Sequence, residues 1–165
     1  MTHRAPTAPA WLLLALPLVC GCATDPGGVP EADETVEVAF ERPYWGRWDG
    51  GPHDSLRTVV RDSVSWREYW IGLSVRPEQH PTAPEIDFSR RMVIAASMGL
   101  RPTLGHRIDI DGIRREGDEL VVDVTSTYPD DGCRQPRVQI APVHMVLVPA
   151  SSLPVRFRES PTQAC

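Results

Sequence analysis

The chain has 165 residues and a formal net charge of −5 at pH 7, with 22 acidic side chains against 17 basic ones. All of the basic side chains are arginines, because the sequence contains no lysine. This acidic balance argues against nucleic acid as a partner and against electrostatic binding to anionic lipid surfaces.

The N-terminus has the pattern of a secretory signal. Arg4 supplies a short positive region, and the apolar run that follows, APAWLLLALPLV, is too short to span a bilayer. The run ends in LVCGCA, where Gly21 stands directly before Cys22. This junction resembles the lipobox of bacterial lipoproteins, which implies that residues 1–21 are removed and that Cys22 becomes the lipidated first residue. The alternative is an ordinary secretory signal peptide that is cleaved near this junction, without lipidation of Cys22.

The lipobox resemblance also implies a location. Several acyl chains on Cys22 would hold the protein durably at a membrane, since each buried CH₂ contributes about 0.8 kcal/mol. Ala23 follows the cysteine, whereas an aspartate there would favour retention at the inner membrane. We expect a bacterial cell-envelope protein that is lipid-anchored in the outer membrane and contacts the membrane through this anchor only.

The rest of the chain divides into a tether and a domain. Residues 22–35 are rich in proline, glycine and acidic residues, which predicts a flexible tether. Residues 36–165 are the size of one domain, able to bury about two-thirds of its unfolded surface. We therefore predict a single β-rich domain after the tether.

Cysteine usage fits an exported protein. Removal of the signal peptide leaves three cysteines, which are Cys22, Cys133 and Cys165. If Cys22 carries the lipid, Cys133 and Cys165 are the two cysteines that can still pair. An oxidising compartment favours a disulfide between Cys133 and Cys165. A metal site is the alternative, but these cysteines have no C-x-x-C or nearby histidine spacing. We predict a structural disulfide and no metal.

One helix is predicted, at about residues 65–74. Its apolar side chains recur at the spacing of a single helix face, and they are Trp66, Tyr69, Trp70 and Leu73. Ser65 and Glu68 have the spacing of a capping box, which predicts that the helix begins at Ser65. The stripe is typical of a helix that packs on a core.

Alternating apolar and polar residues predict the strands. In chain order, the runs are TVEVAF, LRTVVRD, RMVIAASM, GHRIDIDGI, LVVDVTS, HMVLVPA and PVRFRE. The third run is apolar on both faces, which is typical of a central strand, and Pro154 in the last run indicates a sheet edge. The pattern predicts an α+β, β-rich domain, with a mostly antiparallel sheet or sandwich of about six or seven strands.

The segment around the third predicted strand carries a family resemblance. It reads IDFSRRMVIAASMGLRPTLGHRI, with an aspartate–phenylalanine pair, an apolar strand and a turn that contains Gly, Arg, Pro and Thr. These features resemble the PrcB C-terminal-like family, named after a small lipoprotein subunit of a bacterial chymotrypsin-like protease complex. The resemblance extends over about residues 56–159. The sequence departs from the family at Leu104, where glycine is usual, and at His106, where an aromatic residue is usual.

The resemblance implies a membrane-anchored, non-catalytic accessory subunit that acts in protein–protein interaction. The expected partner is an extracytoplasmic protease or another envelope protein. The candidate partner-binding loop consists of Arg101, Pro102, Thr103, Leu104, Gly105 and His106. Pro102 fixes φ and Gly105 permits positive φ, so we expect a rigid, exposed loop that loses little entropy on binding. The alternative is that this turn only connects two strands.

The same loop permits a second function. Its Pro-Thr-x-Gly sequence, followed by His106, resembles the turn that chagasin-like inhibitors insert into cysteine-protease clefts. The resemblance implies that Thr103 lies at the tip of an inhibitory loop.

Aromatic residues permit a third function. Tyr44, Trp45 and Trp48 lie in a glycine-containing predicted loop, where such rings can stack on envelope glycans or anchor a protein partner. The alternative is that they fold back over the core.

Known catalytic patterns do not match this sequence, and we expect no enzyme activity and no cofactor. Ser97 resembles the centre of G-x-S-x-G, but Ala95 replaces the first glycine. The histidines lack metal-ligand spacing and are predicted to be surface or loop residues; they are His53, His80, His106 and His144.

Overall fold

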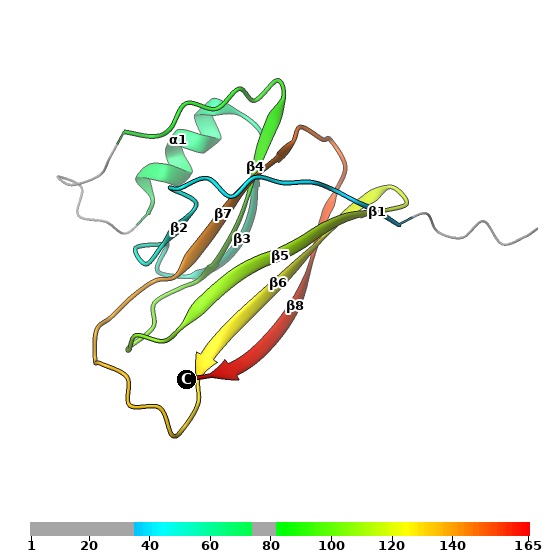
Figure 1. Ribbon diagram of the computed structural model, residues 1–165. Coiled ribbons are helices and arrows are strands. Elements are labelled where there is room, and N and C mark those ends of the chain that lie inside the picture. Colours follow the sequence, from blue (N-terminus) through cyan, green and yellow to red (C-terminus); the bar gives the residue numbers. More distant parts are fainter. Residues whose placement is uncertain (1–34, 74–81) are drawn as a thin grey trace, which may run out of the picture. The chain divides into compact units, whose positions relative to one another are not determined.

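The computed structural model describes residues 35–73 and 82–165, so the predicted signal peptide, Cys22, most of the tether and His80 lie outside the described residues. One helix and eight strands are present in this part (Figure 1). In chain order they are β1 (Thr35–Glu37), β2 (Arg47–Trp48), β3 (Ser55–Val60), α1 (Ser63–Ile71), β4 (Arg91–Met98), β5 (Arg107–Glu116), β6 (Glu119–Pro129), β7 (Val143–Pro149) and β8 (Val155–Ala164). The β-rich prediction is confirmed, and the additional strand is β2, within a predicted loop. No helix in the described ranges is long and apolar enough to cross a bilayer.

The strands form two four-stranded sheets, in the orders β1-β5-β6-β8 and β2-β7-β4-β3. All neighbouring strands are antiparallel except β6 and β8, which are parallel. This exception arises because the chain leaves the first sheet after β6, forms β7 in the second sheet, and then returns to place β8 beside β6. The prediction of a mostly antiparallel arrangement is confirmed.

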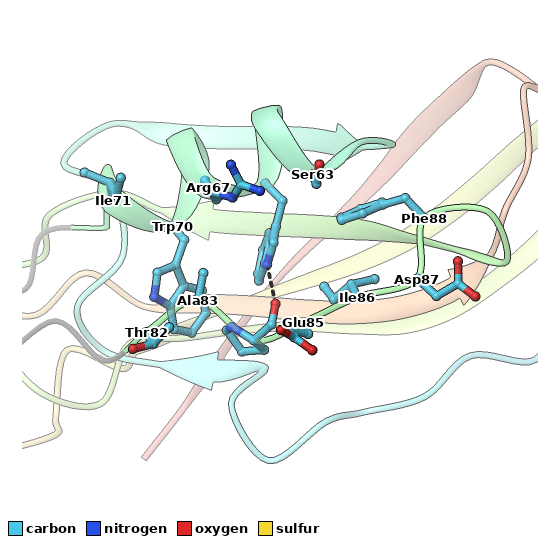
Figure 2. A pocket seen from close by; sticks show the side chains of 12 residues that line it. Ser63, Arg67, Trp70, Ile71, Thr82, Ala83, Glu85, Ile86, Asp87 and Phe88 are labelled. Carbon is cyan, nitrogen blue, oxygen red and sulfur yellow. Dashed lines mark hydrogen bonds between the residues drawn. The ribbon is translucent and has the colours of Figure 1, made fainter.

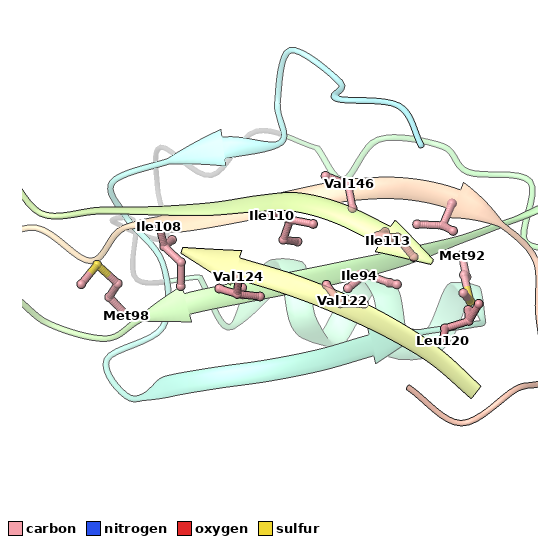
Figure 3. Packing of buried hydrophobic residues seen from close by; sticks show 12 residues of the cluster. Met92, Ile94, Met98, Ile108, Ile110, Ile113, Leu120, Val122, Val124 and Val146 are labelled. Carbon is pink, nitrogen blue, oxygen red and sulfur yellow. The ribbon is translucent and has the colours of Figure 1, made fainter. Parts of the chain in front are cut away.

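The main hydrophobic core lies between the two sheets (Figure 3). Its buried members come from both sheets, and they are Met92, Ile94, Ala96, Met98, Ile108, Ile110, Ile113, Leu120, Val122, Val124, Val146 and Val148. The predicted alternation of β5 holds as far as Ile110, and a register shift between Ile110 and Gly112 then brings Ile113 into the core. The two sheets therefore bury their inner faces against each other.

A second core lies between α1 and the other face of β4 and β7. Its buried members are Val60, Trp66, Trp70, Leu73, Val93, Ala95, Val143 and Met145. Strand β4 thus contributes alternate residues to both cores, which confirms the prediction of a central strand. The predicted helix stripe is also buried here through Trp66, Trp70 and Leu73.

The start of α1 differs from the prediction. Its N-cap is Asp62, whose Oδ1 accepts hydrogen bonds from the backbone N–H groups of Val64 and Ser65, both at 2.9 Å. The capping box predicted at Ser65 is therefore wrong, because Asp62 satisfies these N–H groups three residues earlier. The helix also ends at Ile71, before the predicted residue 74.

Candidate functional site

Loops gather at one end of the sandwich. Strands β4, β6 and β8 end there, and β5 and β7 begin there, as the connecting loops and the C-terminus show in Figure 1. We call this surface the loop end and define it as residues 99–106, residues 130–142 and Cys165. It contains the predicted partner-binding loop.

Backbone hydrogen bonds connect the two loops of the loop end. Arg101 and Ile140 exchange two such bonds, at 2.7 and 3.0 Å, and the Leu104 N–H donates to the Pro136 carbonyl at 3.1 Å. Gly105 has a φ of 88°, and a Cβ atom at this position would lie 2.7 Å from the side chain of Gln135. The turn therefore requires glycine both for its conformation and for its close packing. These contacts hold the predicted loop against the β6–β7 connection.

Several side chains of the predicted loop face the domain. The Arg101 guanidinium donates to the Met98 carbonyl at 2.6 Å and lies 5.8 Å from the ring centroid of Tyr128. The His106 ring packs edge-on against Tyr128, with 5.9 Å between centroids. Thr103 and Leu104 are half-buried, which leaves Pro102 and Gly105 as the exposed residues of the loop. A partner would therefore contact mainly the backbone and these two small residues.

The predicted disulfide is present between Cys133 and Cys165. Next to it, the Asp130 N–H donates to the Ala164 carbonyl at 3.3 Å, and the Cys133 N–H donates to the Asp130 carbonyl at 2.9 Å. The bond joins the C-terminal end of β8 to the loop that supports the predicted partner-binding loop. The loop end is thus stabilised covalently as well as by hydrogen bonds.

The family comparison covers this surface. Residues 92–149 match the family model described as PrcB C-terminal. The resemblance to this family that the sequence indicated is confirmed over these residues. The matched segment extends from β4 to the last residue of β7 and contains both loops of the loop end. No curated protein and no solved structure matches the chain.

The residues of the predicted aromatic contact lie next to α1 and β7, and Trp48 pairs with Val143 of the matched segment. The ring centroid of Trp45 lies 5.4 Å from that of Trp66 and 6.0 Å from that of Trp70, and Trp48 lies 5.8 Å from Trp70. Trp45 and Trp48 therefore pack over the second core. Tyr44, at 96% exposure, is the residue of the predicted aromatic contact that projects into solvent.

A groove of about 810 Å³ lies between α1 and residues 82–88. Figure 2 shows Trp70 and Ile71 on one side of it and Ile86 and Phe88 near its other end. The Trp66 Nε1–H donates across the groove to the Pro84 carbonyl at 2.9 Å. This bond fixes residues 82–88 against the helix. Within the described residues, no group of three or more side chains is arranged to hold a metal ion.

The position of His144 differs from the prediction. This residue lies in β7 and is 2% exposed, so its placement on the surface or in a loop was wrong. Its Nδ1 accepts a hydrogen bond from the Ile110 N–H of β5 at 2.9 Å, which links the two sheets. The sequence placed His144 at the start of a predicted strand, but it did not indicate that the ring would meet a backbone N–H group of another strand.

The surroundings of His144 keep its ring neutral. The pKa of His144 is lowered to about 4, mainly by burial and next by the positive charge of Arg47, while the carboxylate of Asp109 partly opposes these effects. Asp109 itself forms ion pairs with Arg47 and Arg107, which together hold its pKa below the ordinary value although burial opposes them. The neutral ring can therefore accept the hydrogen bond from β5 at physiological pH.

Lowering the pH is expected to destabilise the domain through His144. In the unfolded chain this histidine titrates near 6.5, and in the folded chain near 4, so unfolding takes up a proton between these values. Its contribution to the free energy of unfolding is complete above pH 6.5 and falls by about 3 kcal/mol as the pH drops to 4. Urea denaturation at several pH values between about 7.5 and 5 measures this slope.

The control is His144→Asn, which removes the titrating ring and keeps an oxygen that can accept from the Ile110 N–H. Its free energy of unfolding should depend much less on pH in the same range. An equal pH dependence in the two proteins would contradict the assignment to His144.

Proposed function

We propose that the protein is a lipid-anchored, non-catalytic accessory subunit whose loop end binds an extracytoplasmic protease or another envelope protein. The observation that carries the proposal is that the family-matched segment supplies both loops of the loop end. The lipobox-like junction at Cys22 supports the membrane anchor. The protein–protein role agrees with the family's namesake, a subunit of a protease complex.

The physical properties of the loop end support a binding role. Its two loops are joined by backbone hydrogen bonds, and the disulfide links one of them to the end of β8, so little conformational entropy is lost when a partner binds. It also exposes apolar side chains, since Leu100 is 37% and Val138 49% exposed. Arg134 and Arg137, in the same loop, are exposed and form no ion pair with a described residue. A rigid surface that combines apolar and charged groups suits a protein partner.

A membrane pull-down tests this proposal. We expect the tagged full chain to recover an envelope protease from detergent-solubilised membranes, and Pro102→Arg to reduce that recovery at least about fivefold, because the exposed Pro102 would be replaced by a bulky charge. Val64→Arg, on the exposed side of α1, is the matched control and should leave recovery unchanged. Cys22→Ala should move the protein from the membrane fraction to the soluble fraction.

The activity of the recovered protease separates the two loop-based functions. An active protease supports the accessory subunit. A protease that is inactive until Pro102→Arg releases it supports the chagasin-like inhibitor instead. Recovery of no partner, or equal recovery with Pro102→Arg and Val64→Arg, contradicts both functions of the loop. Recovery of an envelope protein that is not a protease contradicts the inhibitor.

A further inference from the structure

Two arginines of the loop end have no partner for their guanidinium groups among the described residues. They are Arg134 and Arg137, and both are exposed. Most other described arginines form ion pairs, and these are Arg47, Arg57, Arg91, Arg107, Arg114, Arg115, Arg156 and Arg158. Arg42, Arg61 and Arg101 donate to backbone carbonyls instead. The two arginines of the loop end therefore keep their hydrogen-bond donors available for a partner molecule.

The loop end is a basic part of an acidic chain. Residues 99–106 and 134–142 contain three arginines and no aspartate or glutamate, although the whole chain has a net charge of −5. The aspartates of the loop end are Asp130 and Asp131, and the Asp130 N–H donates to the Ala164 carbonyl at 3.3 Å, beside the end of β8. Neither aspartate forms an ion pair with a described arginine. The positive charge of the loop end is therefore not neutralised by its own carboxylates.

The backbone that carries Arg134 and Arg137 is held in place. Arg134 directly follows Cys133, which forms the disulfide. Between the two arginines, the Pro136 carbonyl accepts a hydrogen bond from the Leu104 N–H at 3.1 Å. An arginine on a fixed backbone loses only side-chain freedom when it binds a carboxylate, which lowers the entropy lost on binding.

Exposed apolar side chains lie next to these arginines. Val138, which directly follows the second arginine, is 49% exposed. Arg101 and Ile140 form an antiparallel bridge, in which the residue after one partner lies opposite the residue before the other. The exposed Pro102 therefore lies opposite Gln139, beside Val138. The loop end thus presents a small apolar patch, consisting of Pro102 and Val138, next to two unpaired guanidinium groups.

An acidic partner surface fits this arrangement. A guanidinium binds a carboxylate through two parallel hydrogen bonds. Such a pair contributes little in water, but the apolar patch excludes water around it once a partner is docked. The negative charge of the rest of the chain repels an acidic partner, so the two arginines also direct its approach to the loop end. An anionic bilayer fits less well, because its charge extends beyond the patch and meets the acidic remainder of the chain.

We propose that the loop end recognises an acidic, partly apolar patch on the surface of its partner protein. Carboxylates of the partner pair with Arg134 and Arg137, and its apolar side chains pack on Pro102 and Val138. This inference rests on the proposed function and names the chemistry of the surface that the loop end binds.

A synthetic peptide tests this recognition on the full chain in non-ionic detergent. The probe is a blocked, fluorescent nonapeptide in which pairs of glutamates alternate with single leucines, and its counterpart carries glutamine in place of glutamate. We expect the dissociation constant of the glutamate peptide to be at least about fivefold lower than that of the glutamine peptide, and this preference to shrink as salt is added. Absence of binding, or equal binding of both peptides, would overturn the proposal.

A matched pair of double variants tests the position. Arg134→Gln, Arg137→Gln should abolish the preference for the glutamate peptide. Arg67→Gln, Arg90→Gln makes the same change in net charge at exposed arginines outside the loop end that also form no ion pair with a described residue, and it should keep the preference. A preference that survives in the first variant, or that is lost equally in both variants, contradicts the proposal.

An anionic membrane is the alternative ligand for these arginines. Flotation of the Cys22→Ala chain with vesicles of phosphatidylcholine and phosphatidylglycerol measures this interaction. We expect no binding that depends on Arg134 and Arg137. Vesicle binding that is abolished by Arg134→Gln, Arg137→Gln would assign the two arginines to a membrane and overturn the proposal.

The membrane pull-down separates failure of this inference from failure of the proposed function. The Arg134→Gln, Arg137→Gln variant should reduce recovery of the partner at least about fivefold, as Pro102→Arg does. If Pro102→Arg reduces recovery and the double variant does not, the loop end binds a partner and this inference alone fails. If no partner is recovered while the glutamate peptide still binds through these arginines, the proposed function alone fails.

Discussion

Replacement of Trp66 by alanine is expected to lower the free energy of unfolding by about 3–5 kcal/mol. Trp66 is 2% exposed, and its ring lies 5.2 Å from Trp70 and 5.4 Å from Trp45, so its removal leaves a cavity at the centre of the second core. The change also removes the hydrogen bond from Nε1–H to the Pro84 carbonyl. Because small domains are stable by about 5–15 kcal/mol, this loss is a large part of the total.

Chemical denaturation followed by far-ultraviolet circular dichroism measures the effect, since the substitution itself alters tryptophan fluorescence. The matched control is Tyr44→Ala, at an aromatic position that is 96% exposed, and its effect should stay within about 0.5 kcal/mol. Equal destabilisation by both substitutions would contradict the packing described for α1.

Removal of the disulfide is expected to lower the free energy of unfolding by about 3–4 kcal/mol. Cys133 and Cys165 are separated by 32 positions, and the bond restricts the unfolded chain by closing this loop. The paired serine variant should remain folded, because β8 keeps its pairing with β6 from Val155 to Ala164. Its loss of stability should be accompanied by faster hydrogen exchange at the C-terminal end of β8.

Denaturation of the oxidised protein, with and without a thiol reductant, measures the contribution of this bond. The reductant should shift the midpoint of the wild-type protein and leave that of the Cys133→Ser, Cys165→Ser variant unchanged. Equal midpoints for the oxidised wild-type protein and the variant would show that the bond does not stabilise the folded state.

The candidate site was predictable in part. Pro102 and Gly105, which favour turns, predicted the position of the loop. The family resemblance suggested that this loop binds a partner protein. The sequence did not indicate that this loop pairs with Ile140 and packs on Gln135 and Pro136, because those residues lie thirty or more positions from their partners in the loop. Contacts over such separations are set by strand pairing, which local patterns do not specify.

The sequence by itself determined the local features of this protein. Two-residue alternation identified the strands, and the spacing from Trp66 to Leu73 identified the buried face of the helix. Two cysteines in a chain with a predicted export signal identified the disulfide. Each of these follows from short-range periodicity or from the chemistry of a compartment.

Only the tertiary structure decided the order of the strands and the burial of His144. These depend on which strands become neighbours, and the parallel pairing of β8 with β6 joins segments that are separated by the whole of β7. A polar side chain such as His144 is stable in the interior because one N–H group from the other sheet meets it there. That coincidence of position arises from the fold, and no local pattern in the sequence encodes it.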